Sequence, residues 1–218
     1  MRGPSLSLNC RRSWMPTSER LAALGNGVFA RIDQAKQAYR QRGEGLPLID
    51  LSLGSTDLSP PEDVLQCMAD AMHDPISSSY CLNAATAPFQ QAVADWCRHR
   101  FGVDVDPKRE VQLLVGSQEG TAHLPLAILD PGDRALHLDP SYPSHRGGLV
   151  LAGADLLSLS LLPEQDWRPD LGALPSETWD LLKLFVLGYP HNPTARVGDQ
   201  DLLDQAMQRG CRHQVVIA

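Results

Sequence analysis

The stretch Leu182-Lys-Leu-Phe-Val-Leu-Gly-Tyr-Pro-His-Asn-Pro-Thr-Ala195 joins a short apolar segment to a loop that contains glycine, proline and polar residues. Residues 182–188 are typical of a buried strand, and the loop residues that follow are typical of a turn. Similar apolar segments alternate with helical or loop segments over the rest of the chain from residue 111. They lie at about 111–115, 134–138, 155–160 and 214–218. This alternation predicts an α/β fold with parallel β-α-β units.

The residues before this region are predicted to be mainly helical. Apolar residues recur every three or four positions over 19–40, which predicts an amphipathic helix interrupted near Gly25 and Gly27. Residues 49–53 are expected to form a short strand that leads into Gly54.

Two further helices are predicted before residue 101. Ser59 is expected to cap the first of them, with Pro60 in its first turn. Thr86 is expected to cap the second. The predicted inner face of the first helix contains Val64, Met68 and Met72.

The composition excludes several classes of function. The net charge is −7 and no basic tract is present, which argues against nucleic acid and anionic membranes as partners. The five cysteines never form Cys-x-x-Cys, so neither a disulfide framework nor a zinc site is indicated, and no metal is expected. No apolar run approaches the roughly 20 residues of a membrane helix. A reduced, cytoplasmic location is the default.

The first candidate site is the turn Val115-Gly-Ser-Gln-Glu-Gly120, between a predicted strand and a predicted helix over 121–129. Such a turn points backbone N–H groups at one spot, where the helix dipole adds partial positive charge. This arrangement suits a phosphate monoester. Taken alone, the pattern is also typical of ordinary helix capping.

Two more candidate sites follow predicted strands. Leu138-Asp-Pro-Ser-Tyr-Pro143 places an aromatic ring at the edge where open parallel sheets bind ligands, and such a ring can stack on a flat heterocycle. Gly188-Tyr-Pro-His-Asn-Pro-Thr-Ala195 offers an amide that can donate a hydrogen bond to a phenolic oxygen. Each is also an ordinary turn sequence. His123 and His137, on a predicted helix and strand, are expected to be packed or hydrogen-bonded. Two interpretations of His191 stay open: a position at the rim of a cofactor site, and an ordinary position in a loop.

The order and spacing of these motifs resemble those of the class I and II, fold-type-I aminotransferases, in particular the aspartate, alanine and LL-diaminopimelate aminotransferase branch. The resemblance runs from about Arg20 to Ala218. The matching stretches are 51–57, 80–96, 101–107, 116–120, 130–133, 139–143 and 189–194. The resemblance implies the large domain of that fold, incomplete here, preceded by a helical segment of the small domain. It also implies these boundaries: a disordered leader over 1–18, an N-terminal segment over 19–58 and a partial cofactor-binding domain over 59–218.

The resemblance further implies a cofactor, pyridoxal 5′-phosphate, and transfer of an amino group between an amino acid and a 2-oxo acid. Ser117 and Gln118 match the phosphate-binding position, and Tyr142 matches the aromatic that stacks on the pyridine ring. Asn192 matches the residue that hydrogen-bonds the phenolic oxygen. Two other matches concern the dimer and the substrate: Tyr80 would reach the phosphate of a partner subunit in a homodimer, and Gly54 would lie beside the substrate carboxylate.

The sequence also departs from the family pattern. The usual Asn-Pro-Thr-Gly ends in Ala195, which matters only if that position needs a positive φ. The usual glycine after the loop tyrosine is Ala85, and Phe89-Gln90 stands in place of the usual Leu-Arg. Gly27 replaces a tyrosine that many relatives use in the substrate pocket. The amino-acid substrate therefore does not follow from the resemblance.

In this family the acidic partner of the pyridine nitrogen, the Schiff-base lysine and two substrate- and phosphate-binding arginines come after the strand that matches 214–218. No residue of this chain matches them, so no catalytic residue is assigned. Lys36, Lys108 and Lys183 are the chain's lysines, and each is expected to be a solvated surface group. The isolated chain is therefore expected to be truncated, inactive and poorly stable.

Three hypotheses about function remain open at this point. The chain belongs to an aminotransferase, or it is a non-catalytic remnant or interaction fragment, or it belongs to an α,β-eliminating lyase that shares the fold.

Overall fold

The structure of the chain is a computed structural model that describes residues 17–25, 27–43, 45–80 and 83–218. The chain divides into two compact units. The sheet unit comprises Met1–Gly43 together with Gln118–Ala218, and the helical unit comprises Glu44–Ser117. The predicted leader falls almost entirely on residues 1–16, which lie outside the described residues.

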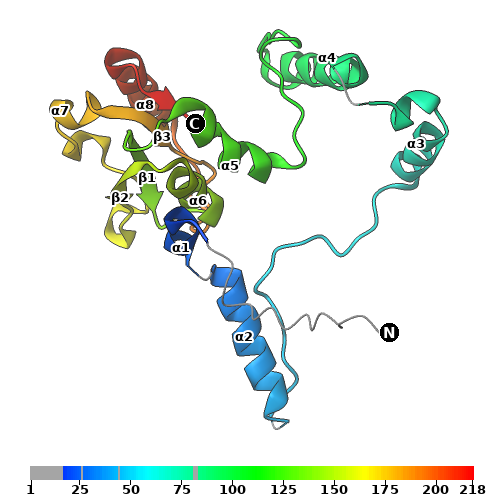
Figure 1. The fold of residues 1–218 in the computed structure, drawn as a ribbon, viewed down its shortest axis with the longest axis horizontal. Coiled ribbons are helices and arrows are strands. Elements are labelled where there is room, and N and C mark those ends of the chain that lie inside the picture. Colours follow the sequence, from blue (N-terminus) through cyan, green and yellow to red (C-terminus); the bar gives the residue numbers. More distant parts are fainter. Residues whose placement is uncertain (1–16, 26, 44, 81–82) are drawn as a thin grey trace, which may run out of the picture. The chain divides into compact units, whose positions relative to one another are not determined.

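The sheet unit contains a four-stranded parallel sheet with the order β2-β1-β3-β4 (Figure 1). The strands are β1 (Arg134–Asp139), β2 (Asp155–Ser160), β3 (Leu182–Val186) and β4 (Val216–Ile217). The predicted α/β class is therefore confirmed, and four of the five strands predicted beyond residue 110 are present.

Helices cover both faces of this sheet, as a parallel sheet requires. On one face, Leu136 and Leu138 of β1 and Phe185 of β3 pack with α7 (Ser176–Trp179) and α8 (Gln200–His213). The other face packs with α6 (Pro143–Ala152) and the end of α5 (Ser117–Ile128). Its buried residues are Leu129, Ala135, Leu149, Ala152, Leu184 and Val186.

The chain leaves two adjacent strands toward opposite faces of the sheet. After β1 it enters α6, and after β3 it enters α8, whose start is capped by the Asp199 carboxylate accepting from Leu202 N–H at 2.7 Å. Arg168 holds this cap through ion pairs to Asp199 at 3.1 Å and Asp201 at 2.6 Å. Because the two connections diverge, the carboxyl ends of β1 and β3 form a topological switch point, the usual ligand crevice of open α/β sheets.

Two short helices precede the helical unit. They are α1 (Glu19–Leu24) and α2 (Val28–Gln41), and the break between them falls at Gly25, whose φ of +62° suits glycine. The predicted interruption is therefore confirmed. The α1 helix is attached to α6, where Arg20 Nη1 donates to Leu151 O at 3.0 Å.

The helical unit contains α3 (Glu62–Met72), a 3₁₀ turn η2 (Pro75–Ser78) and α4 (Asn83–Phe101). The predicted start of α3 at Ser59 and Pro60 is wrong, because a residue before proline avoids helical geometry and Pro60 is followed by Pro61. The predicted cap at Thr86 is also wrong. The helix extends back to Asn83 through two alanines, the strongest helix formers.

Two predicted strands are absent from the described part of this unit: residues 49–53 and 111–115 carry no regular structure. A strand requires hydrogen-bonded neighbours, and the sheet pairs none with these segments. The expected inner face of α3 is exposed as well: Val64, Met68 and Met72 have 44%, 60% and 74% of their surface accessible.

Candidate cofactor site

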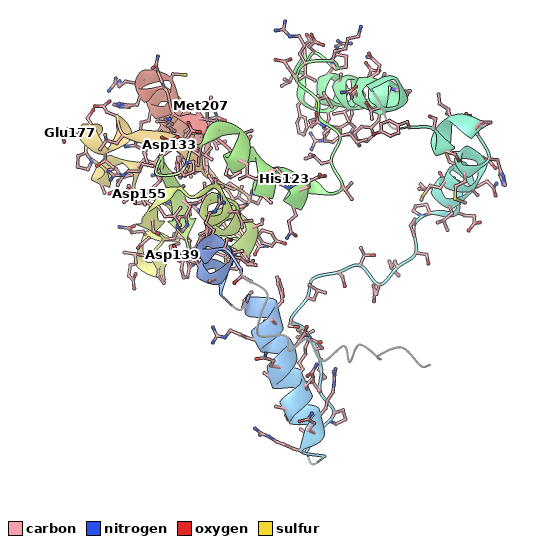
Figure 2. The ribbon with its side chains drawn as sticks, viewed as in Figure 1. His123, Asp133, Asp139, Asp155, Glu177 and Met207 are labelled. Atoms are coloured by element: carbon pink, nitrogen blue, oxygen red, sulfur yellow. The ribbon has the colours of Figure 1, made fainter. Side chains whose placement is uncertain are left out.

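The candidate site lies at the carboxyl edge of the sheet. Figure 2 labels Asp133 and Asp139, which stand just before and at the end of β1 and so mark its amino and carboxyl ends. The loop 140–142 follows the carboxyl end of β1, and the loop 188–194 follows that of β3. Both loops therefore lie at the switch point of the sheet.

The structure brings Tyr142 and Gln118 together, although 24 residues separate them. Tyr142 directly precedes α6 and is half-buried, and its hydroxyl donates to Gln118 Oε1 at 3.3 Å. Gln118 is the second residue of α5. The aromatic ring thus lies beside the start of a helix.

The start of α5 offers hydrogen-bond donors. Gly116, with a φ of +79°, turns the chain into the helix, and Ser117 is its exposed first residue. The N–H groups of a first helical turn have no acceptor within the helix, and the dipole there favours an anion. A 2.9 Å hydrogen bond between Thr121 Oγ1 and Ser144 Oγ holds this turn against α6.

The loop after β3 presents Asn192, which is exposed, beside His191, which has 4% of its surface accessible. The loop is closed by its own backbone: His191 N–H donates to Arg196 O at 2.7 Å, and Ala195 N–H donates to His191 O at 2.8 Å. Ala195 has a φ of +60°. The position does need a positive φ, so replacing the family's glycine by alanine introduces strain there.

Two further histidines lie on β1 and α5. His137 on β1 has 3% of its surface accessible; its Nδ1 lies 2.8 Å from Leu138 O and its Nε2 lies 2.9 Å from Ser158 Oγ. It is packed and hydrogen-bonded, as predicted. His123, in contrast, is exposed on α5, with Nδ1 3.9 Å from Glu119.

His145 was not predicted from the sequence as a residue of this site. Its ring lies 5.8 Å from the Tyr142 ring, and it fills the space above Gly188, where an added Cβ would lie 2.6 Å from its Cε1. Burial lowers the pKa of His145, and the neighbouring His191 and His137 lower it further. Its position three residues after Tyr142, the spacing of neighbours on one face of a helix, was the available signal.

Tyr80 and Gly54 belong to the helical unit. Tyr80 has 86% of its surface accessible, and no atom lies within 4 Å of a Cβ built at Gly54. Both positions are open enough for a ligand or a second chain. Their roles stay predictions.

Each of the two lysines in the sheet unit is held by an ion pair of its own. Lys183 enters β3 at the amino end of the sheet and pairs with Asp133 at 2.7 Å, and this hydrogen bond raises the pKa of Lys183. Lys36 pairs with Asp33 on α2 at 2.7 Å. Lys108 lies in the polar turn of the helical unit, where its N–H donates to the Asp106 carboxylate.

The residues at the carboxyl edge fit a flat phosphorylated ring. They combine the donors at the start of α5, the half-buried aromatic face of Tyr142 and the exposed amide of Asn192. In the described part of the chain, no cluster of His, Cys, Asp and Glu could hold a metal ion. No helix there has the length and apolar character that crossing a membrane requires.

This chain belongs to the class I and II aminotransferases, because the family model for "Aminotransferase class I and II" matches residues 47–217. The members of this family are pyridoxal-phosphate-dependent enzymes. The chain is 36% identical over 201 residues to the LL-diaminopimelate aminotransferase of Maridesulfovibrio salexigens, covering 92% of this chain and 51% of that protein.

Solved structures agree with this assignment. A probable N-succinyldiaminopimelate aminotransferase from Thermus thermophilus is 41% identical, with a TM-score of 0.81 over 88% of this chain and 51% of that one. An aminotransferase from Staphylococcus aureus is 28% identical, with a TM-score of 0.80 over 92% and 50%. The chain thus spans about half the length of the relatives it matches. The predicted family and its fold are confirmed.

Proposed function

We propose that this chain forms the phosphate- and ring-binding part of the cofactor site of a pyridoxal-phosphate-dependent aminotransferase. The observation that supports this most directly is the hydrogen bond between Tyr142 and Gln118. It joins an aromatic side chain to the start of α5 at the switch point of the sheet. A phosphorylated heterocycle needs both features at one place.

Each side chain at this edge has a distinct role in the proposal. Ser117 and the first N–H groups of α5 bind the phosphate, with Gln118 beside them. Tyr142 stacks on the pyridine ring, and Asn192 donates to its phenolic oxygen. When bound, the cofactor supplies the electron sink for bond breaking at the substrate Cα.

The chain alone is proposed to be inactive. A lysine that carries the cofactor must reach the ring in its neutral form. Lys183 lies at the wrong end of the sheet and is held protonated by Asp133. Lys36 is paired on α2 and Lys108 is in a polar turn. Transamination is therefore expected only where a lysine from outside residues 1–218 reaches the site.

The partners in this proposal are an amino acid, a 2-oxo acid and a second copy of the subunit. Two relatives carry diaminopimelate or its succinyl derivative in their names, so these compounds are the first substrates to test. In a homodimer, Tyr80 would contact the cofactor phosphate that the partner subunit binds. Gly54 would lie beside the substrate carboxylate. A cytoplasmic location accords with the composition.

The test is binding of pyridoxamine 5′-phosphate, which needs no lysine, to the 218-residue chain by fluorescence titration. Loss of an aromatic stacking surface in Tyr142→Ala should weaken binding about tenfold. Loss of one hydrogen-bond donor in Ser117→Ala should weaken it about three- to tenfold. Pyridoxamine without the phosphate should bind much more weakly.

Ser176→Ala is the matched control, because Ser176 is also the exposed first residue of a helix, α7. It should bind the probe as the unmodified chain does. Failure of the unmodified chain to bind the probe, or equal binding by Tyr142→Ala, would contradict the proposed function.

A further inference from the structure

The side chain of His191 joins two loops at the switch point. Its Nε2 lies 3.0 Å from the carbonyl oxygen of Pro140, which follows β1, and its Nδ1 lies 2.7 Å from Thr194 Oγ1 in its own loop after β3. Because the chain leaves β1 and β3 toward opposite faces, the loops diverge here. One imidazole thus joins them.

The partners of the ring determine its tautomer. A carbonyl oxygen only accepts, so Nε2 carries the proton and donates to Pro140 O. In the neutral ring Nδ1 then accepts from the Thr194 hydroxyl. Thr194 Oγ1 also lies 3.4 Å from Arg196 N–H, which can donate to it. Every polar group of this buried link is therefore satisfied by a neutral imidazole.

The link lies next to the residues that face the proposed ring. Asn192 adjoins His191 in sequence, and Tyr142 stands two residues after Pro140. The backbone bonds of His191 to Ala195 and Arg196 fix the loop from which its ring extends. A shift of the imidazole would therefore change the spacing between Asn192 and Tyr142.

We propose that His191 is a positioning residue, which holds Asn192 and Tyr142 at a fixed spacing across the crevice through its Nε2–H···O bond to Pro140. The inference rests on the proposed function, since the spacing matters for a ligand that both residues contact. His191 itself touches no reacting atom in this proposal. It orders two loops before the ligand arrives, and this lowers the entropic cost of binding.

Two substitutions separate the bond to Pro140 from the packing of the ring. In His191→Gln the amide reaches as far as Nε2 and can still donate to Pro140 O. In His191→Asn the amide reaches only as far as Nδ1, so it keeps the partner Thr194 but loses Pro140. Asparagine is one methylene smaller than glutamine, so the comparison is completed by the nitrogen-15 measurement below, which does not depend on packing.

Two measurements on the 218-residue chain distinguish these variants. In His191→Asn the dissociation constant for pyridoxamine 5′-phosphate should rise about tenfold, and in His191→Gln it should stay within about threefold. Without ligand, the His145 amide, which donates to Tyr142 O at 3.0 Å, should exchange with deuterium about tenfold faster in His191→Asn alone.

Equal behaviour of the two variants in the exchange measurement would overturn the inference. If the unmodified chain did not bind the probe, the proposed function would fail, and the exchange measurement would still decide whether His191 couples the loops. A third measurement needs no variant. Nitrogen-15 spectra of labelled histidine should show the proton of His191 on Nε2, and a proton on Nδ1 alone would overturn the inference.

Discussion

At the scale of single residues, the site edge contains a buried histidine, His137, whose pKa is lowered. Burial is the main cause that lowers the pKa of His137, since a charged imidazole there would lose its hydration. Arg146 on α6 lowers it further, whereas the hydrogen bond to Leu138 O and the charge of Asp139 oppose the shift. His145 and Ser158 face the same ring from α6 and β2.

This lowered pKa predicts how stability changes with pH. In the unfolded chain His137 takes up a proton near its ordinary pKa of 6.5, whereas in the folded chain it does so only at lower pH. The unfolded state therefore binds more protons as the pH falls below about 6.5, and the folded state loses stability. Urea unfolding at pH 7.5 and 5.5 should show this loss, and His137→Gln should reduce it.

The control for this prediction is His123→Gln, because His123 is exposed on α5. It should leave the pH dependence unchanged. The lowered pKa values of Asp133 and Asp199 act below their ordinary value of 3.8 and so lie outside this pH interval. An identical pH dependence for His137→Gln and the unmodified chain would contradict the assignment.

Some of these residue-level features could be predicted from sequence, and others could not. The turn after β3 and its polar residues were evident from proline and asparagine. The positive φ of Ala195 could not be predicted from the sequence, because this backbone angle depends on how the loop closes on His191 and Arg196. The bond from His191 to Pro140 joins residues 51 apart, and no local pattern encodes it.

At the scale of elements, α5 and α6 approach closely at one glycine. A Cβ at Gly148 would lie 2.7 Å from Thr121 O and 3.1 Å from Ala122 O, both backbone atoms that cannot move aside cheaply. At the neighbouring Gly147 it would meet only the flexible end of Leu24, at 3.8 Å. The two glycines of one helix thus have different roles.

This difference predicts opposite effects of the same substitution. Gly148→Ala should destabilise the chain by about 1–3 kcal/mol, because α5 must move away from α6. Gly147→Ala should be neutral or stabilising by up to about 1 kcal/mol, because alanine favours a helix interior. Free energies of unfolding in urea measure both. Equal effects of the two substitutions would show that the helices do not approach at Gly148.

The elements that could be predicted are those whose signal is local. The apolar segments of β1, β2 and β3 and the interrupted helix over 19–40 follow from periodicity and glycine. The segments 49–53 and 111–115 have equally apolar sequences but no strand partner. Strand formation depends on a neighbour far away in sequence, so an apolar run alone cannot establish it.

At the scale of the whole molecule, the two units differ in what they bury. Among the residues that the structure describes, Ala94 is the one buried apolar residue of the helical unit. The rest of the buried apolar set lies between Pro125 and Val215 in the sheet unit. Burial of apolar surface is the main source of stability, so local opening should need less free energy in the helical unit.

Limited proteolysis of the 218-residue chain by trypsin measures this difference, because both units contain cleavable residues. Cleavage after Arg100 and Lys108 of the helical unit should be at least about tenfold faster than cleavage after Arg134 or Lys183 of the sheet unit. Arg134 and Lys183 are also held by ion pairs. A resistant product that begins near residue 110 should therefore accumulate. A folded sheet that is buried on both faces protects its connecting segments from the protease. Cleavage at comparable rates in both units would therefore contradict this distribution of stability.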